Sequence, residues 1–282
     1  MKNSQRELFD AVSFRSCRIT TMAYSTSFGI GIRMLDKKMR DPICAIYGMV
    51  RFADEIVDTF HEHDKPVLMR RFREDVFNAI REKISLNPIL NAFQKTCHDY
   101  NIGDELIDTF LRSMEMDLDR SLYDRKGYDE YILGSAEVVG LMCLKVFTAN
   151  QPDQYEMLKP YAMSLGAAFQ KINFLRDMKA DYVDLGRTYF PHLDFSNFSE
   201  HEKSQIEEEI EKDFNHAYEG ILKLPREARL GVLTAYVYYK RLFSKIRSVP
   251  SHRIMEERIR IPNQKKLALL MGCYIRNNLN LL

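Results

Sequence analysis

The sequence contains no tryptophan, only 12 glycines and 9 prolines in 282 residues, and almost no strand-like alternation of apolar and polar residues. It also lacks any run approaching the roughly 18 uncharged apolar residues that a membrane-spanning helix requires. The formal net charge of +1 is not the basic composition typical of nucleic-acid-binding proteins. These absences favour an all-α protein with no transmembrane helix and no nucleic-acid partner.

Cysteine is also scarce, since the five cysteines are scattered and none stands in a zinc-binding spacing. Such cysteines are typical of small core side chains in a reduced, intracellular protein. No secretory signal peptide is visible, because residues 1–10 are polar and charged. We therefore expect a cytoplasmic protein. The cysteines are Cys17, Cys44, Cys97, Cys143 and Cys273.

Apolar residues recur at helical spacing over most of the chain. Pro42, Pro66 and Pro88 stand where the first residue of a helix belongs. No Gly/Ser-rich linker, repeat or low-complexity stretch divides the sequence, so residues 1–282 are predicted to form a single domain. The predicted helices lie near residues 4–17, 24–35, 42–59, 66–84, 88–98, 104–118, 128–148, 154–179, 199–222, 226–247 and 263–277.

The predicted helix 128–148 carries small residues at Gly134, Ser135, Ala136 and Gly140. Glycine inside a helix is unfavourable by about 1 kcal/mol relative to alanine. Small residues are kept there either because another helix packs closely or because a ligand needs the room. The sequence leaves both explanations open.

Two aspartate pairs have the same spacing: Asp54 with Asp58, and Asp177 with Asp181. Four residues apart on a helix, each pair lies on one face, where like charges repel. Four carboxylates that face each other across a cavity make a hard-oxygen site suited to Mg²⁺, with room left for phosphate oxygens. The pairs therefore indicate chemistry on a diphosphate.

Each pair extends into a polar stripe. Tyr47 and Arg51 lie on the face of the first pair, and Gln170 and Asn173 on the face of the second. The other faces of both helices are apolar, which predicts that the helices are buried. Buried carboxylates are costly unless they bind metal or cations.

Asp-x-x-x-Asp alone is a weak pattern, and for either pair by itself a solvated helix face remains open. A third copy, Asp104 with Asp108, we interpret as a helix start, because a carboxylate there caps free N–H groups. Three arginines are candidate diphosphate clamps, since guanidinium matches phosphate oxygens bidentately. A surface ion pair is the alternative for each of them. They are Arg51, Arg176 and Arg187.

On these residues the chain resembles the squalene/phytoene synthases, which are head-to-head prenyl transferases of the isoprenoid-synthase fold. The first matching block is Ser27-Phe28 followed by YGMVRFADEIVD at residues 47–58. The second is QKINFLRDMKAD at residues 170–181 with GRTYFP at residues 186–191. A middle block, YILGSAEVVG, stands at residues 131–140, and Tyr239 and Arg258 match more loosely.

The resemblance implies a single-domain helical bundle with a central cavity in which Mg²⁺ bridges to the substrate diphosphate; Mn²⁺ is expected to substitute. The implied metal ligands are Asp54, Asp58, Asn173, Asp177 and Asp181. The four aspartates are also implied to be catalytic, together with the cation- or proton-steering tyrosines Tyr47, Tyr131 and Tyr239. The implied substrate-binding residues are Ser27, Phe28, Arg51, Gln170, Asn173, Arg176, Arg187, Arg258, Ser135, Ala136 and Gly140.

Two positions depart from the family pattern. Glu55 replaces the middle aspartate of the first block but keeps its carboxylate, so we expect little effect. Glu137 replaces a small residue, and it either alters the pocket or reaches the metal cluster.

For the product, similarity to bacterial carotenoid-pathway members and the absence of a C-terminal membrane anchor favour phytoene, made from two geranylgeranyl diphosphates without NADPH. Dehydrosqualene or squalene from farnesyl diphosphate is the alternative. A non-catalytic lipid-binding or assembly relative is disfavoured, because the aspartates and their neighbours are all present. A di-iron bundle is disfavoured because only a lone Asp213…His216 approaches its motif.

The product is a long hydrocarbon, so peripheral membrane contact is expected for its release. Residues 265–271 (KKLALLM) either lie on a membrane surface or form a final core-packing helix. We expect a monomer or a weak dimer.

Overall fold

The structure is a computed structural model that describes residues 2–119, 123–191, 193 and 198–261. These residues form helices and no strand, so the all-α prediction is confirmed. The elements are α1 (Lys2–Tyr24), α2 (Thr26–Arg33), α3 (Lys37–Asp58), α4 (Lys65–Glu82), α5 (Pro88–Tyr100), α6 (Asp104–Asp119), α7 (Arg125–Ile132), the π-helical turn η1 (Leu133–Glu137), α8 (Val138–Phe147), α9 (Pro152–Leu185), α10 (Glu200–Lys223), α11 (Arg226–Arg247) and α12 (Ser251–Glu256).

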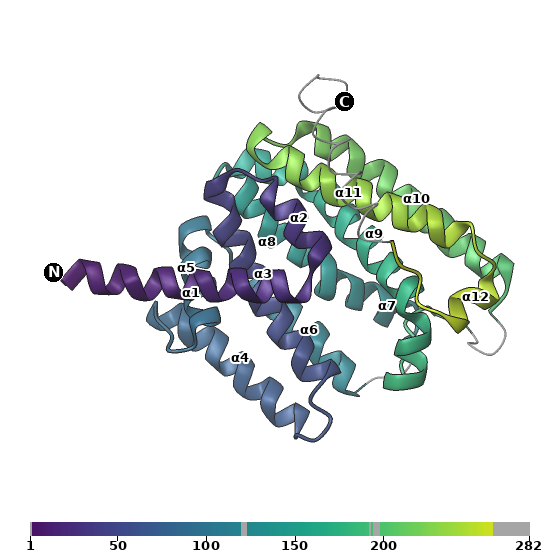
Figure 1. The fold of residues 1–282 in the computed structure, drawn as a ribbon, viewed down its shortest axis with the longest axis horizontal. Coiled ribbons are helices and arrows are strands. Elements are labelled where there is room, and N and C mark those ends of the chain that lie inside the picture. Colours follow the sequence, from purple (N-terminus) through teal and green to yellow (C-terminus); the bar gives the residue numbers. More distant parts are fainter. Residues whose placement is uncertain (1, 120–122, 192, 194–197, 262–282) are drawn as a thin grey trace.

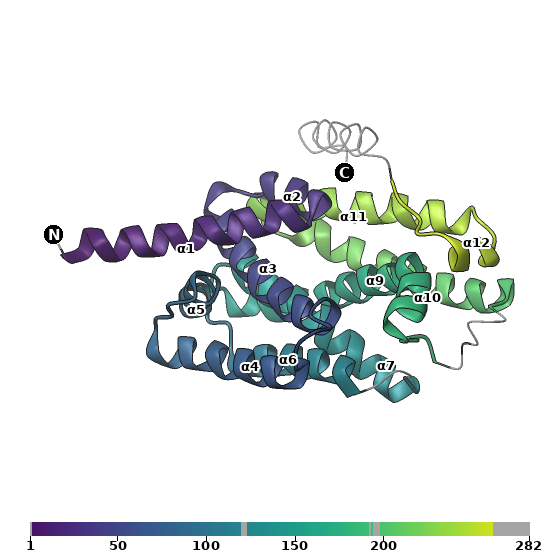
Figure 2. The ribbon, with the colours of Figure 1, turned by 60° about the horizontal axis from the view of Figure 1, so that its bottom comes forward.

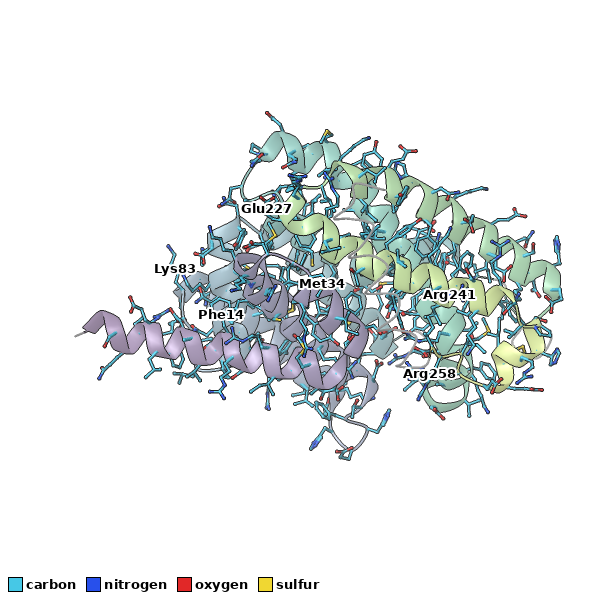
Figure 3. The ribbon with its side chains drawn as sticks, turned by 45° about the horizontal axis from the view of Figure 1, so that its top comes forward. Phe14, Met34, Lys83, Glu227, Arg241 and Arg258 are labelled. Carbon is cyan, nitrogen blue, oxygen red and sulfur yellow. The ribbon has the colours of Figure 1, made fainter. Side chains whose placement is uncertain are left out.

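The helices are stacked in layers. Figure 2 shows α1, α2 and α11 along one side and α4, α6 and α7 along the other, with α3 and α9 crossing between them. α10 packs along α9 (Figure 1). The α2–α3 turn is tied to the start of α11, because the Asp36 N–H donates to the Glu227 carbonyl at 2.9 Å, in the region where Figure 3 labels Met34 and Glu227. The two aspartate pairs thus come from the two central helices.

Two large apolar clusters build the interior. One is formed mainly by α1 to α6 with part of α8, and the other by α7 and α9 to α12. Ala53 and Val57 of α3 belong to the first cluster, while Ile172 and Leu175 of α9 belong to the second. Each central helix is therefore held by its own core, and the polar stripes lie where the two clusters meet.

Several predicted helix starts are confirmed by their caps. The Asn87 side chain accepts the N–H groups of Ile89 and Leu90 at the start of α5. Ser199 and Glu202 form a reciprocal capping box at the start of α10. These are local interactions between neighbouring residues, which is why the sequence alone predicts them.

The predicted start at Pro42 is wrong. α3 begins at Lys37, because the Asp36 carboxylate accepts the Lys38 N–H at 2.9 Å and caps the helix one turn earlier. Pro42 lies inside the helix, where its missing N–H leaves the Lys38 carbonyl without a helical donor. Burial of Met39 and Ile43 offsets that loss.

The first helix is also longer than predicted. α1 runs to Tyr24, and Ser25 then caps α2 by accepting the Phe28 N–H at 3.1 Å. Leu8 and Ile19 face solvent on α1, which breaks the apolar periodicity that the prediction used.

The small residues of the middle block serve close packing at two points. A side chain on Gly134 would lie 2.5 Å from the Ser113 Cβ of α6. A side chain on Gly166 of α9 would lie 2.6 Å from the Ala136 carbonyl. Between these contacts the helix widens into the π turn η1, instead of continuing as the single helix 128–148.

The helix α9 continues to Leu185, past the predicted end at 179, and stops at Gly186 with φ of 65°. Glycine adopts this left-handed conformation readily, and the chain turns back so that the Arg187 N–H donates to the Asp181 carbonyl at 2.8 Å. The stretch 248–261, which lies after the predicted helix 226–247 and outside all predicted helices, contains the short helix α12. The helix expected near 263–277, the segment 265–271 and Cys273 lie outside the described residues.

No helix in the described ranges is long and apolar enough to cross a membrane. The other four cysteines are free, and three of them are buried, as expected of core side chains. Burial raises the pKa of the Cys17 thiol to about 12, so it is not a reactive thiolate at neutral pH.

Candidate active site

The predicted stripes lie on single helix faces, with their apolar neighbours buried. α3 carries Tyr47, Arg51, Asp54 and Asp58 at half-buried positions, while Ala53 and Val57 are buried. α9 carries the second stripe in the same way: Gln170, Asn173, Asp177 and Asp181 are half-buried, whereas Ala168, Ile172 and Leu175 are buried.

On α3, the two aspartates have different partners. The Asp58 carboxylate is bound by Arg187, whose Nη1 donates to Oδ1 at 2.8 Å. The Arg51 guanidinium bonds to Glu55 and lies 3.9 Å from Asp54, outside hydrogen-bond distance. The Glu55 carboxylate, the departure from the family pattern, thus competes with Asp54 for Arg51.

On α9, the two aspartates also differ in their arginine partners. Two arginines bind Asp177: Arg176 Nε donates to Oδ1 at 3.0 Å, and Arg258 Nε lies 2.6 Å from Oδ1. Arg258 comes from the segment after α12 (Figure 3). Within the described ranges, no arginine or lysine side chain ion-pairs with Asp181.

Asp54 and Asp181, which have weak or no arginine contact, both have raised pKa values. Burial, with the charge of Asp58, raises the pKa of Asp54 to about 7. Burial, with the charges of Asp177 and Asp58, raises the pKa of Asp181 to about 8. The Asp58 charge acts on both, so the α3 and α9 pairs share one electrostatic site.

Arg187 spans this site. Its side chain is 7% exposed, and besides Asp58 it donates from Nη2 to the Val57 carbonyl at 3.0 Å. Its Nη1 lies 3.5 Å from the carboxylate of Asp117 on α6. Arg187 therefore connects the loop after α9 to both α3 and α6, which the sequence did not predict.

Asp117 is a site residue that the sequence analysis missed. Its carboxylate accepts the hydroxyls of Tyr131 at 2.6 Å, Tyr123 at 2.9 Å and Tyr189 at 3.2 Å. Burial raises its pKa to about 6, although Arg187 opposes the shift. A signal was present, because Asp117 continues the apolar face of α6 three residues after the buried Met114.

Aromatic side chains close the site on the side of Tyr47. The Phe28 ring, in the first turn of α2 beside Ser27, lies 6.1 Å from the rings of Tyr47 and Tyr239. The Tyr239 ring stacks on Phe169 at 3.9 Å. These rings form an apolar wall next to the carboxylates.

The Tyr239 hydroxyl also joins this wall to the α9 stripe. It donates to Asn173 Oδ1 at 3.2 Å, and Asn173 Nδ2 donates to Gln170 at 3.4 Å. Burial raises the pKa of Tyr47 to about 12, with Asp54 adding to the shift. The Tyr47 hydroxyl therefore keeps its proton at neutral pH.

The middle block packs against α9 through its small residues. The Ser135 Oγ is buried and has no hydrogen-bond partner among the described residues. Gly140 faces the Ala162 carbonyl of α9, where an added side chain would meet it at 3.0 Å. The substrate-binding roles of Ser135, Ala136 and Gly140 stay predictions.

Glu137 is influenced by another charge cluster. Burial and the nearby Asp213 raise its pKa to about 7, and Lys171 opposes the shift. Lys171 is itself bound to Asp213 at 2.8 Å and lies 3.2 Å from Glu209. The charges that shift the pKa of Glu137 thus come from residues outside the two aspartate pairs, and its effect on the pocket or on a metal site stays a prediction.

The donor set fits a divalent cation. The site joins six carboxyl groups with four arginines, so acidic side chains outnumber basic ones by two. Carboxylate oxygens are the ligands that Mg²⁺ prefers. Within the described part of the chain, no three His, Cys, Asp or Glu side chains are close enough to hold one ion, so each aspartate pair offers its ligands separately. The carboxylates are Asp54, Glu55, Asp58, Asp117, Asp177 and Asp181, and the arginines are Arg51, Arg176, Arg187 and Arg258.

Comparison with known proteins agrees with this geometry. The family model described as squalene/phytoene synthase matches residues 21–265. The chain belongs to the squalene/phytoene synthase family. It is accordingly a prenyltransferase, as the sequence predicted.

Two curated relatives illustrate the range of the family. The 15-cis-phytoene synthase of Synechocystis is 29% identical over 94% of this chain and 85% of its own length. The 4,4'-diapophytoene synthase of Staphylococcus haemolyticus is 26% identical over 71% of this chain and 68% of its own length.

The fold of this squalene/phytoene synthase family member matches solved structures. A crystal structure of a dehydrosqualene synthase superposes with a TM-score of 0.81 at 19% identity, covering 94% of this chain and 96% of that one. The predicted isoprenoid-synthase helical fold is thus confirmed. The predicted central cavity and the single-domain boundary at 1–282 stay predictions.

Proposed function

We propose that the protein condenses two molecules of geranylgeranyl diphosphate head to head, through a cyclopropyl diphosphate, to phytoene in carotenoid biosynthesis. The observation that carries the proposal is the pair of aspartate stripes on α3 and α9, joined by Arg187 and bordered by the aromatic wall of Phe28, Phe169 and Tyr239. The stripes suit a charged diphosphate, and the wall suits a prenyl chain.

Mg²⁺, with Mn²⁺ as a substitute, would be held by the four paired aspartates and Asn173, and when bound it neutralises the charge of the departing diphosphate. The excess of carboxylates over arginines, and the raised pKa values of Asp54 and Asp181, support this assignment. Neither carboxylate has a hydrogen-bonded cation within the described structure, and a coordinated divalent ion would supply the missing positive charge.

The chain's own groups assist in three ways. Arg51, Arg176 and Arg258 surround the paired aspartates and present guanidinium groups to a diphosphate. The aromatic wall excludes water, which would otherwise quench an allylic cation. The Tyr131 hydroxyl, bonded to Asp117, and the Tyr239 hydroxyl, bonded to Asn173, orient the reacting chains or the departing proton.

The length of the substrate is inferred from the coverage of the relatives. The phytoene synthases of Synechocystis and Arthrospira platensis align with 94% of this chain. The diapophytoene synthase and a presqualene diphosphate synthase align with 71% and 60% of it. The alternative is a farnesyl diphosphate-using dehydrosqualene or squalene synthase, which the superposed dehydrosqualene synthase favours.

No NADPH is required by the proposed reaction, because phytoene forms without a reductant. We also propose peripheral contact with a membrane, since the product is a long hydrocarbon, and activity as a monomer or weak dimer in the cytoplasm. The segment 265–271 stays the predicted contact.

The proposal is tested by incubating the purified protein with Mg²⁺ and either geranylgeranyl or farnesyl diphosphate, without NADPH. The extracted lipid is analysed by mass spectrometry, with the Asp54→Ala variant as the inactive control. A 40-carbon hydrocarbon from the longer substrate is expected. A 30-carbon product from the shorter one would favour the alternative, a cyclopropyl diphosphate that clears on adding NADPH would indicate squalene synthesis, and no reaction with either would refute the proposal.

A further inference from the structure

Asp117 is a buried acid that no predicted role accounts for. Its side chain is 3% exposed, and it comes from α6, which carries none of the predicted site residues. A buried carboxylate is unfavourable unless hydrogen bonds and an opposite charge compensate it. The compensating groups show what the residue is for.

Both carboxylate oxygens of Asp117 are occupied. Oδ1 accepts the hydroxyls of Tyr123 and Tyr189, at 2.9 and 3.2 Å. Oδ2 accepts the Tyr131 hydroxyl at 2.6 Å and lies 3.5 Å from Arg187 Nη1. Asp117 therefore gathers side chains from α7, from the segment before α7 and from the loop after α9.

The same Arg187 nitrogen that faces Asp117 donates to Asp58 at 2.8 Å. Its guanidinium thus lies between a carboxylate of α6 and one of the paired aspartates of α3. The Tyr189 hydroxyl is 3.4 Å from this nitrogen, so Tyr189 links Arg187 and Asp117 a second time. Without Asp117, Asp58 would be the one remaining carboxylate among the described residues that pairs with Arg187.

We propose that Asp117 is a positioning residue that holds Arg187 against Asp58 and fixes the Tyr131 hydroxyl beside the aspartate pairs. It acts through these neighbours, because its own oxygens are buried and already occupied. The functional half of this inference rests on the proposed diphosphate site. The geometric half, that Asp117 holds Arg187, stands on the contacts alone.

The geometric half is tested on the protein without substrate. Arg187 is 7% exposed and should react slowly with phenylglyoxal, an arginine reagent. In Asp117→Asn the amide keeps an acceptor oxygen for a tyrosine but loses the charge that holds the guanidinium. We expect modification of Arg187, located by peptide mass spectrometry, to become about tenfold faster. An unchanged rate would overturn the inference.

The functional half is tested by titrating inorganic pyrophosphate into the protein in the presence of Mn²⁺ and measuring binding by calorimetry. Asp117→Asn should bind pyrophosphate about tenfold more weakly than the parent protein and raise the KM for prenyl diphosphate more than it lowers kcat. Parent-like affinity would overturn this half. If the parent protein itself binds no pyrophosphate, the proposed function fails, while the phenylglyoxal rates still decide whether Asp117 holds Arg187.

The matched control is Asp108→Asn. Asp108 lies on the same helix, is 30% exposed, and pairs with Arg73 and Arg112 on the surface. The chemical change is identical, but Arg187 is not involved. We expect Asp108→Asn to leave the modification rate of Arg187 and the affinity for pyrophosphate as they are in the parent protein. If it changed them as much as Asp117→Asn does, both effects would come from a general destabilisation of the fold, and the inference would be overturned.

If Asp117→Asn does not fold, the double variant Asp117→Asn/Arg187→Gln removes both charges of the pair and should be better tolerated. It is compared with Arg187→Gln alone. Since Asp117 is proposed to act on pyrophosphate through Arg187, the two should bind it equally. A further loss of affinity in the double variant would contradict the inference.

Discussion

The α3 and α9 stripes each carry two half-buried aspartates four residues apart, but different arginines compensate their charges. On α3, the second aspartate, Asp58, is bound by Arg187, and the first is left with a distant arginine. On α9 the order is reversed: the first aspartate, Asp177, is bound by two arginines, and the second, Asp181, by none in the described structure. Each pair therefore has one compensated carboxylate and one whose pKa is raised.

This contrast indicates which carboxylates lack a compensating positive charge. Arginine already neutralises Asp58 and Asp177, while Asp54 and Asp181 hold protons near neutral pH instead. A divalent ion would displace those protons. In the proposed site, Asp54 and Asp181 would therefore contribute more to metal affinity than the two aspartates that arginines already bind.

The largest expected effect comes from removing one aspartate from either stripe. Asp54→Ala or Asp177→Ala removes a metal ligand from α3 or α9 and should lower the rate of diphosphate release by about 10²–10³-fold or more. The helical circular dichroism should remain, because neither side chain belongs to an apolar cluster. Retained activity in both variants would contradict the interpretation of the aspartates as metal ligands.

The two kinds of aspartate should respond oppositely in stability. Without added metal at pH 8, Asp54→Asn relieves repulsion and should raise the melting temperature, whereas Asp58→Asn leaves the buried Arg187 guanidinium with one partner fewer and should lower it. Each kcal/mol corresponds to about 2–4 °C in a protein of this size. Calorimetric scans of both variants beside the parent check the signs, and a loss of stability in both would remove the distinction.

The comparison also predicts a pH dependence. Raised pKa values mean that the folded state binds protons at Asp54 and Asp181 more tightly than the unfolded state does. Their contribution to stability is therefore present at acidic pH and is lost as pH rises from about 4 through 7 to 8. Metal affinity runs the other way: as the pH falls below 8 at Asp181 and below 7 at Asp54, it should drop by up to about tenfold per pH unit for each proton that the metal must displace.

Manganese binding followed by electron paramagnetic resonance across this range measures that dependence. The double variant Asp54→Asn/Asp181→Asn should bind metal weakly, and its melting temperature should depend less on pH than that of the parent protein. A metal affinity of the parent protein that stays constant between pH 6 and 8 would contradict the assignment of these two residues.

The smallest expected effect concerns the aromatic wall. Tyr239→Phe keeps the ring stacked on Phe169 and removes the hydrogen bond to Asn173, so kcat/KM should fall by about two- to tenfold. Tyr236→Phe is the control, because this buried ring on the same helix contacts Phe214 instead. Equal losses in both variants would mean that the hydroxyl–Asn173 bond has no special role.

Local patterns in the sequence were sufficient for most of the fold. Caps at Asn87 and Ser199, and the periodicity of α3 and α9, involve residues within one or two turns, so their interactions are visible in the sequence. The predictions failed at Pro42, where a competing cap at Asp36 was stronger, and in α1, where exposed apolar residues break the periodicity.

The residues of the site could also be predicted from spacing along the helices, whereas the ion pairs and hydrogen bonds between them could not. Four-residue spacing determined that Asp54 and Asp58 share a face, as Asp177 and Asp181 do. The packing of the helices, in contrast, brings Arg187 to Asp58, 129 positions away, and places three tyrosine hydroxyls on Asp117. Helical spacing is a property of consecutive residues, but ion pairing depends on which buried charges the packed helices bring within reach.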